Sequence, residues 1–156
     1  MLERKQRSNM QEHDLYAMLA DYLRYNYKGI IWRFDLAADL KLTIGQARKH
    51  KRLQQHRGYP DLFIAEPRGV KASCKVIQPG DSAIKEAQFI EQKHGLYLEI
   101  KKAGTRIFKK DGTLVSDEHI REQFDVLEQL RRRGYMAEFA CGFDEAKRII
   151  DEYLGK

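Results

Sequence analysis

Apolar and polar residues along the chain follow two different periods, which predict helices in some segments and strands in others. Apolar residues that recur every three or four positions indicate amphipathic helices. Thr43 and Gln46 add the pattern of a capping box, and Ser116 is the expected N-cap of a later helix. The segments with helical spacing are residues 10–25, 44–57, 116–133 and 143–154.

Short apolar runs lie between these segments and predict β-strands at residues 30–34, 61–65, 95–101 and 136–141. Residues 66–94 are less regular, with a short helix expected at 83–93. Residues 104–115 predict a turn-rich excursion with a hairpin closed at Asp111-Gly112. The order α, β, α, β, β, α, β, α predicts an α/β fold in which helices flank a mixed sheet.

Composition limits the class of protein further. The 156 residues suffice for a domain with its own core, and no flexible linker divides them, so we expect one domain spanning 1–156. Lys and Arg outnumber Asp and Glu by 29 to 23, which modestly favours a polyanionic partner. Cys74 and Cys141 lack the spacing of a metal site or disulfide framework, so we expect packing roles and a reducing compartment.

No apolar run approaches the roughly 18 residues of a membrane span, and the first residues lack the apolar core of a signal peptide. We therefore expect no membrane partner and a cytoplasmic location.

The alternating stretch "GLYLEIK" at 95–101 places an acid and a base on one face of a strand. Glu99 and Lys101 are two residues apart, so their side chains project together. Asp61 begins another apolar strand, and its carboxyl would converge on Glu99 if the two strands pair. Neighbouring carboxylates repel unless a cation lies between them, and Mg²⁺ needs only one or two of them. The pattern favours metal-assisted phosphodiester hydrolysis, with the lysine orienting or deprotonating the attacking water.

Each of these residues also has a simpler explanation. Glu99 and Lys101 fit an exposed cross-strand ion pair, and Asp61 fits a turn. Glu12 falls inside the arc of the apolar stripe of its helix, where a carboxylate needs a metal-bound water or a lysine as partner. It also fits a first-turn acid favoured by the helix dipole. Gln123 lies at the rim of a buried helix face, where its amide could orient water or phosphate, or simply pack.

Basic residues concentrate in the predicted helix before Gly58, which contains no acid. Phosphate contacts from this helix would deliver DNA to Asp61 and make binding sensitive to salt, although a solvated helix face is the simpler alternative. Lys109 and Lys110, beside the expected turn, could grip a second duplex arm. The candidate DNA-binding residues of the helix are Arg48, Lys49, Lys51, Arg52 and Arg57.

Three segments together resemble a known nuclease family. They are "GYPDLFIA", "GLYLEIKKAGTRI" and "VSDEHIREQFDVLEQLRRRGYMAEFACGFDEAKRIIDEYL". They are similar to the VRR-NUC family, the virus-type replication and repair nuclease branch of the PD-(D/E)XK superfamily. Pro60-Asp61 matches the PD and Glu99-Ile100-Lys101 matches the ExK, while Gln123 matches the glutamine of the following helix. The opening helix "QEHDLYAMLADYL" is similar as well, with its glutamate at Glu12.

The resemblance extends over residues 10–154, with some departures. The gap between Asp61 and Glu99 is longer than the family usually has, so 66–94 is identified as an insertion. Tyr16 and Asp35 stand where the family often carries glutamine and asparagine.

The resemblance implies a PD-(D/E)XK core of order αβββαβ and a metal-dependent endonuclease. Under it, Asp61, Glu99 and the Ile100 carbonyl would bind Mg²⁺ or Mn²⁺, and Glu12 would hold the ion through water. Lys101 would position the nucleophilic water, which Gln123 would orient, and hydrolysis would leave a 5′-phosphate. The implied catalytic set is Glu12, Asp61, Glu99, Lys101 and Gln123.

Stand-alone members of this family resemble structure-selective nucleases, some of them similar to Holliday junction resolvases that act as homodimers. The resemblance therefore implies branched DNA as partner and a second copy of the chain. Two other functions stay open at this stage. One is a non-catalytic nucleic-acid-binding module, and the other is a sequence-specific restriction-type endonuclease that uses 66–94 for recognition.

Overall fold

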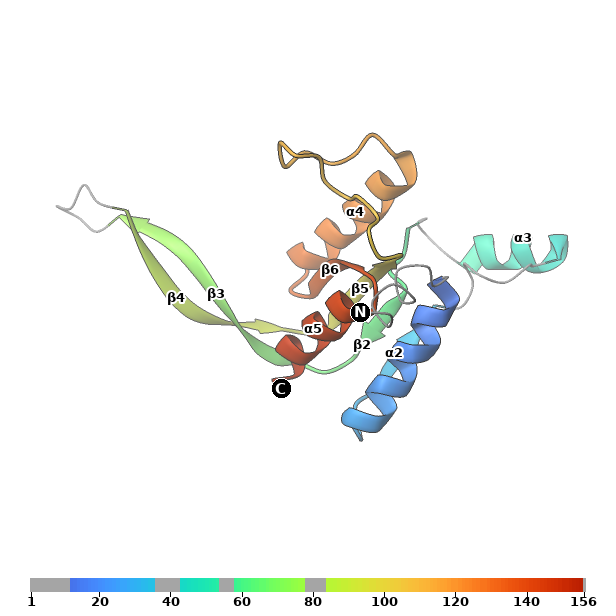
Figure 1. Cartoon of the computed structure of the whole chain (residues 1–156), viewed down its shortest axis with the longest axis horizontal. Coiled ribbons are helices and arrows are strands. Elements are labelled where there is room, and N and C mark those ends of the chain that lie inside the picture. The colour runs from blue at the N-terminus through green and yellow to red at the C-terminus, as the bar shows by residue number, and fades with distance from the viewer. Residues whose placement is uncertain (1–11, 36–42, 54–57, 78–83, 156) are drawn as a thin grey trace, which may run out of the picture.

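The computed structural model describes residues 12–35, 43–53, 58–77 and 84–155. A four-stranded sheet forms the centre of the molecule (Figure 1). Its strands lie in the order β1 (Trp32–Phe34), β2 (Leu62–Ile64), β5 (Leu96–Lys101) and β6 (Met136–Cys141). β2 pairs antiparallel with both β1 and β5, whereas β5 and β6 run parallel, so the sheet is mixed as predicted.

Helices cover both faces of this sheet because its central strands are buried on both sides. α2 (Glu12–Asn26) and α5 (Phe143–Leu154) pack on one face, where Leu19 and Ile150 join Leu98 in the larger apolar cluster. α4 (Glu118–Arg132) covers the other face, where Leu127 packs with Tyr97. The alternation of side chains along β5 therefore divides the strand between two cores. The polar residues at the end of β5 lie on the face that α4 covers.

Local signals in the sequence account for where several helices begin. Thr43 and Gln46 form the expected capping box, because the Gln46 amide donates to Thr43 Oγ1 over 3.3 Å and Thr43 donates back to the Gln46 side chain over 2.9 Å. This box opens α3 (Ile44–Leu53). The N-cap of α4 is Asp117 rather than the predicted Ser116, since the carboxylate of Asp117 accepts the Ile120 amide at 3.0 Å.

Residues that were predicted to be irregular or helical form a second sheet. β3 (Arg68–Ile77) and β4 (Ile84–Lys93) pair antiparallel along ten residues each and project from the central sheet as a long arm (Figure 1). The helix predicted at 83–93 is therefore wrong. Its sequence, rich in Lys, Glu, Ala and Gln, has helix propensity, but pairing with β3 overrides that preference. The arm occupies the segment identified as an insertion.

The structure also bears on the predicted turn at Asp111-Gly112, on the cysteines and on membrane-spanning helices. The expected turn forms, with the Asp111 carboxylate accepting the Thr113 amide at 2.9 Å and Gly112 at φ +81°. Both cysteines are free, and Cys74 is exposed, which contradicts its predicted packing role. Within the described residues, no helix combines the length and apolar character that crossing a lipid bilayer requires.

Candidate functional site

The pairing of β2 with β5 brings the two predicted carboxylates together. Leu62 lies opposite Leu98, so the next pair outward in this antiparallel register sets Asp61 opposite Glu99. Opposed residues share one face of a sheet. The Ile100 amide donates to Asp61 Oδ2 over 2.7 Å, which fixes the Asp61 carboxylate beside β5. Two residues that are 38 positions apart in the chain thereby become neighbours.

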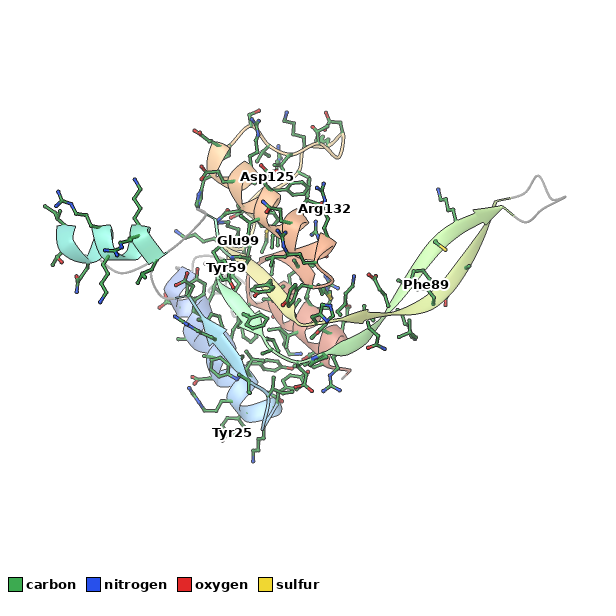
Figure 2. All side chains as sticks on the ribbon, turned by 180° about the vertical axis from the view of Figure 1, so that it is seen from behind. Tyr25, Tyr59, Phe89, Glu99, Asp125 and Arg132 are labelled. Carbon is green, nitrogen blue, oxygen red and sulfur yellow. The ribbon has the colours of Figure 1, made fainter. Side chains whose placement is uncertain are left out.

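Four polar side chains around this point are buried, although such groups are usually exposed. Glu99 is 2% exposed, and Gln123, Asp61 and Lys101 range from 4% to 9%. They lie on the face covered by α4, and Figure 2 shows Glu99 near the middle of the molecule. The alternative of an exposed cross-strand ion pair is therefore wrong. Burying charges is costly unless they are paired, so their contacts decide what the site can do.

Glu99 is the centre of these contacts. Its Oε1 atom accepts from Lys101 Nζ over 2.9 Å and from the side-chain amide of Gln123. Its Oε2 atom is also buried and receives no hydrogen bond from the described residues. Burial first, and then the negative charge of Asp61, raise the pKa of Glu99 to about 8, although Lys101 acts in the opposite direction. A single lysine does not compensate the carboxyl pair.

This arrangement fits a divalent cation. Two carboxylates and the carbonyl of Ile100 supply hard oxygen ligands, and Mg²⁺ completes its shell with water and phosphate oxygens. The free lone pairs of Glu99 Oε2 are where such an ion would replace the missing partner. No group of three or more His, Cys, Asp or Glu residues within the described part of the chain has metal-binding geometry. Glu12 begins α2, but its side chain lies outside the described residues.

The loop before β2 is held against α4 by close backbone contact. Gly58 has φ +77°, and a Cβ atom at this position would lie 2.9 Å from the Gln123 amide nitrogen. Only glycine fits this approach in this backbone conformation. The loop that carries Asp61 and the helix that carries Gln123 are therefore locked together at the site.

Two residues near the site escaped sequence reasoning. His119 lies one turn before Gln123 on α4, and its Nε2 atom lies 3.1 Å from Gln123 Nε2. Because that amide nitrogen is a donor, the histidine nitrogen accepts. Tyr59 precedes Asp61 by two residues, is 47% exposed, and holds its hydroxyl 3.0 Å from that of Tyr97. The four-residue spacing of His119 and Gln123 was the available signal.

The predicted DNA-binding residues do not line the carboxylate site. α3 stands clear of the central sheet in Figure 1, and its basic side chains are exposed. Lys109 and Lys110 are exposed in the loop before α4, where Lys109 donates its amide to Thr113 O over 2.7 Å. The described basic residues of α3 are Arg48, Lys49, Lys51 and Arg52, and Arg57 lies outside the described residues.

The fold and this site together define a mixed α/β protein that buries a carboxylate pair and a lysine at its central strands. Among solved structures, the chain is similar to one titled VRR_NUC domain protein. The match has 23% sequence identity and a TM-score of 0.57 and covers 94% of this chain and 89% of that one. The chain therefore has the fold that the sequence resemblance implied. No protein-family model and no curated protein matches the chain.

Proposed function

We propose that this protein is a metal-dependent, structure-selective DNA endonuclease. The observation that carries the proposal is the buried meeting of Asp61 and Glu99, with one Glu99 oxygen left without a hydrogen bond from the described residues. A carboxyl pair of this kind destabilises the fold by itself and becomes favourable once a cation binds. The fold shared with a VRR_NUC domain protein supports the same reading.

Asp61, Glu99 and the Ile100 carbonyl would hold Mg²⁺ or Mn²⁺, with Glu12 contributing through water. When bound, the ion supplies Lewis-acid stabilisation of charge on the phosphate and activates water. The chain itself supplies the positioning. Glu99 holds the Lys101 ammonium group by the 2.9 Å ion pair, so this group is fixed where it can donate a hydrogen bond to the attacking water.

Gln123 has a complementary role. Its amide nitrogen is engaged by Glu99 and His119, whereas its Oε1 atom is buried and makes no hydrogen bond with the described residues. We assign this oxygen to orienting the attacking water. The proton released by that water would pass to solvent, because the Gln123 amide stays neutral and the Lys101 ammonium group has no free lone pair.

The proposed substrate is branched DNA, and the proposed active form is a homodimer. Basic side chains on α3 and at Lys109 and Lys110 would contact phosphates on separate duplex arms. Symmetric cleavage of a junction needs two active sites at fixed spacing, which a two-fold dimer provides.

A panel of labelled substrates tests the proposal. Flaps, splayed arms, four-way junctions and linear duplexes are incubated with Mg²⁺ or Mn²⁺, and with EDTA as a blank. We expect cleavage of branched substrates, reduced by at least about 100-fold in Asp61→Asn and in Lys101→Ala. Binding without cleavage in any metal would indicate a non-catalytic module, and cleavage at one sequence in linear duplex would indicate a restriction-type enzyme.

A further inference from the structure

The β3–β4 arm has two chemically different faces. In an antiparallel ribbon, directly opposed residues share a face and successive residues alternate. One face carries Ala72 opposite Phe89 and Cys74 opposite Ala87 at its middle, with Val70 opposite Glu91 and Arg68 opposite Lys93 toward its base, and we call it the apolar face after its middle. The other carries Lys71 opposite Ile90, Ser73 opposite Gln88, and Lys75, and we call it the polar face.

The structure supports this division independently. A Cβ atom added at Gly69 would lie 2.6 Å from Ile90 and 3.2 Å from the Gln92 side chain, so both of these residues cover Gly69 on the polar face. Lys71, Ser73, Lys75 and Gln88 are all exposed. The polar face thus exposes hydrogen-bonding and cationic groups around one exposed apolar side chain, Ile90.

Charge on the arm favours a polyanionic partner. Between Arg68 and Lys93 the sequence has five basic and three acidic residues. Of the side chains that the structure describes on the arm, the one acid is Glu91, which belongs to the apolar face and pairs with Lys93. The polar face therefore presents Lys71 opposite Ile90, and Lys75 opposite Glu86.

The arm is also placed where a long substrate would pass. Figures 1 and 2 show α3 at one end of the long axis, the arm at the other, and Glu99 between them. From Glu99 back to His94, at the bend between β5 and β4, is five residues, at most roughly 17 Å. Ten-residue strands extend the arm by roughly 33 Å more, about one turn of a DNA duplex.

We propose that the polar face of the arm binds the groove of a duplex arm of the DNA substrate, about 5 to 15 base pairs from the scissile phosphate. A two-stranded ribbon fits the major groove, which is about 12 Å wide. Lys71 and Lys75 contact phosphates, while Ser73 and Gln88 reach groove edges. This inference rests on the proposed DNA endonuclease function.

Length dependence tests the inference directly. The Asp61→Asn chain, which is expected to bind without cleaving, is titrated with junctions whose arms vary from about 6 to 20 base pairs. With long arms, adding Lys71→Ala and Lys75→Ala is expected to weaken binding about tenfold and to reduce the salt slope by about 2. With arms of 6 base pairs, the same substitutions have no effect, because the DNA ends before it reaches the ribbon.

Two controls sharpen the result. The control variant Lys28→Ala with Arg148→Ala removes the same charge from two exposed positions, one after α2 and one on α5. It is expected to leave the length dependence unchanged. Phe89→Ser alters the apolar face and leaves DNA affinity unchanged. The inference is overturned if the lysine variant binds long arms normally, if its loss is equal at all lengths, or if only Phe89→Ser weakens binding while dissociating a dimer. That last result would make the arm a protein interface.

The test also separates this inference from the proposed function. Cleavage by the wild-type chain is scored on the same junctions. Cleavage that is unaffected by the lysine substitutions at every arm length removes the arm's role and leaves the nuclease intact. Absence of cleavage in any metal, together with length-dependent binding, removes the nuclease and leaves the arm as a DNA-binding element.

Discussion

Glu99 is buried beside a second carboxyl group, and this environment raises its pKa. Its pKa is about 8 in the folded chain and 4.5 in the reference state, because burial and Asp61 disfavour its charge. Between these values the folded state keeps a proton that the unfolded state has lost. Rising pH therefore lowers the free energy of unfolding across this window, since the unfolded state binds fewer protons.

We expect urea unfolding in EDTA to show stability falling from pH 5 to pH 8 by several kcal/mol, at about 1.4 kcal/mol per unit of pKa difference. Glu99→Gln should remove most of this fall, whereas Asp125→Asn, at an exposed acid on α4, should keep it. Saturating Mn²⁺ should flatten the wild-type profile but leave Glu99→Gln unchanged. A flat wild-type profile in EDTA would mean that Glu99 stays ionised in the fold.

His119 offers a second test at this scale. Its Nε2 atom accepts from the Gln123 amide, so it fixes which way the amide faces. Losing one such hydrogen bond costs about 1 kcal/mol. We expect His119→Ala to lower kcat about fivefold with KM unchanged, and His119→Asn to recover part of the loss through its own acceptor oxygen.

Arg121→Ala, an exposed neighbour on the same helix, serves as the control. A loss in His119→Ala that His119→Asn does not relieve would assign the histidine a different role.

At the scale of elements, the contact between the 58–61 loop and α4 governs the geometry of the site. Gly58→Ala combines a backbone conformation unfavourable for alanine with a Cβ atom 2.9 Å from Gln123. We expect a stability loss of about 1–3 kcal/mol and weaker Mn²⁺ binding by calorimetry. Gly112→Ala has nearly the same φ but open space, so it should lose stability while binding Mn²⁺ normally. Equal Mn²⁺ affinity in both variants would contradict the coupling.

The basic helix α3 is the second element with a testable role. Arg48→Ala with Arg52→Ala should weaken junction binding and lower the slope of log affinity against log salt by about 2. Arg132→Ala with Arg133→Ala removes two exposed arginines at the end of α4 and should leave the slope unchanged. Equal slopes for wild type and the α3 variant would place the DNA path elsewhere.

Sequence patterns predicted these elements where local and tertiary preferences agree. The amphipathic helices, the capping box and the strand "LYLEIK" formed as expected because each pattern matches its own packing. The helix predicted over "IKEAQFIEQK" was wrong because helix propensity does not show that a segment has a strand to pair with. The i, i+2 rule predicted that Glu99 and Lys101 share a face, and Asp61 was predicted to meet Glu99 if its strand pairs with β5, as it does. His119 required knowing which turn of α4 covers Glu99.

At the scale of the whole molecule, the described parts lie along one axis, with the candidate site between a basic helix and a projecting arm (Figure 1). One such chain has one carboxylate pair in its described residues, so under the proposed function it would cut one strand at a time. Resolving a four-way junction requires that two opposed strands are cut together. The proposed homodimer therefore leads to a prediction about cleavage, which a binding measurement alone does not test.

We expect sedimentation equilibrium to give a mass close to twice 18.3 kDa at micromolar concentration. A cruciform on a supercoiled plasmid should be linearised without accumulation of nicked circles, because both strands are cut within the lifetime of one complex. Mixing wild-type chain with an excess of Asp61→Asn chain should form heterodimers that carry one intact site, and nicked circles should then accumulate. Nicked circles that accumulate with the wild-type chain alone would show that each chain cuts independently, since supercoil release after the first nick removes the cruciform unless a second site acts at once.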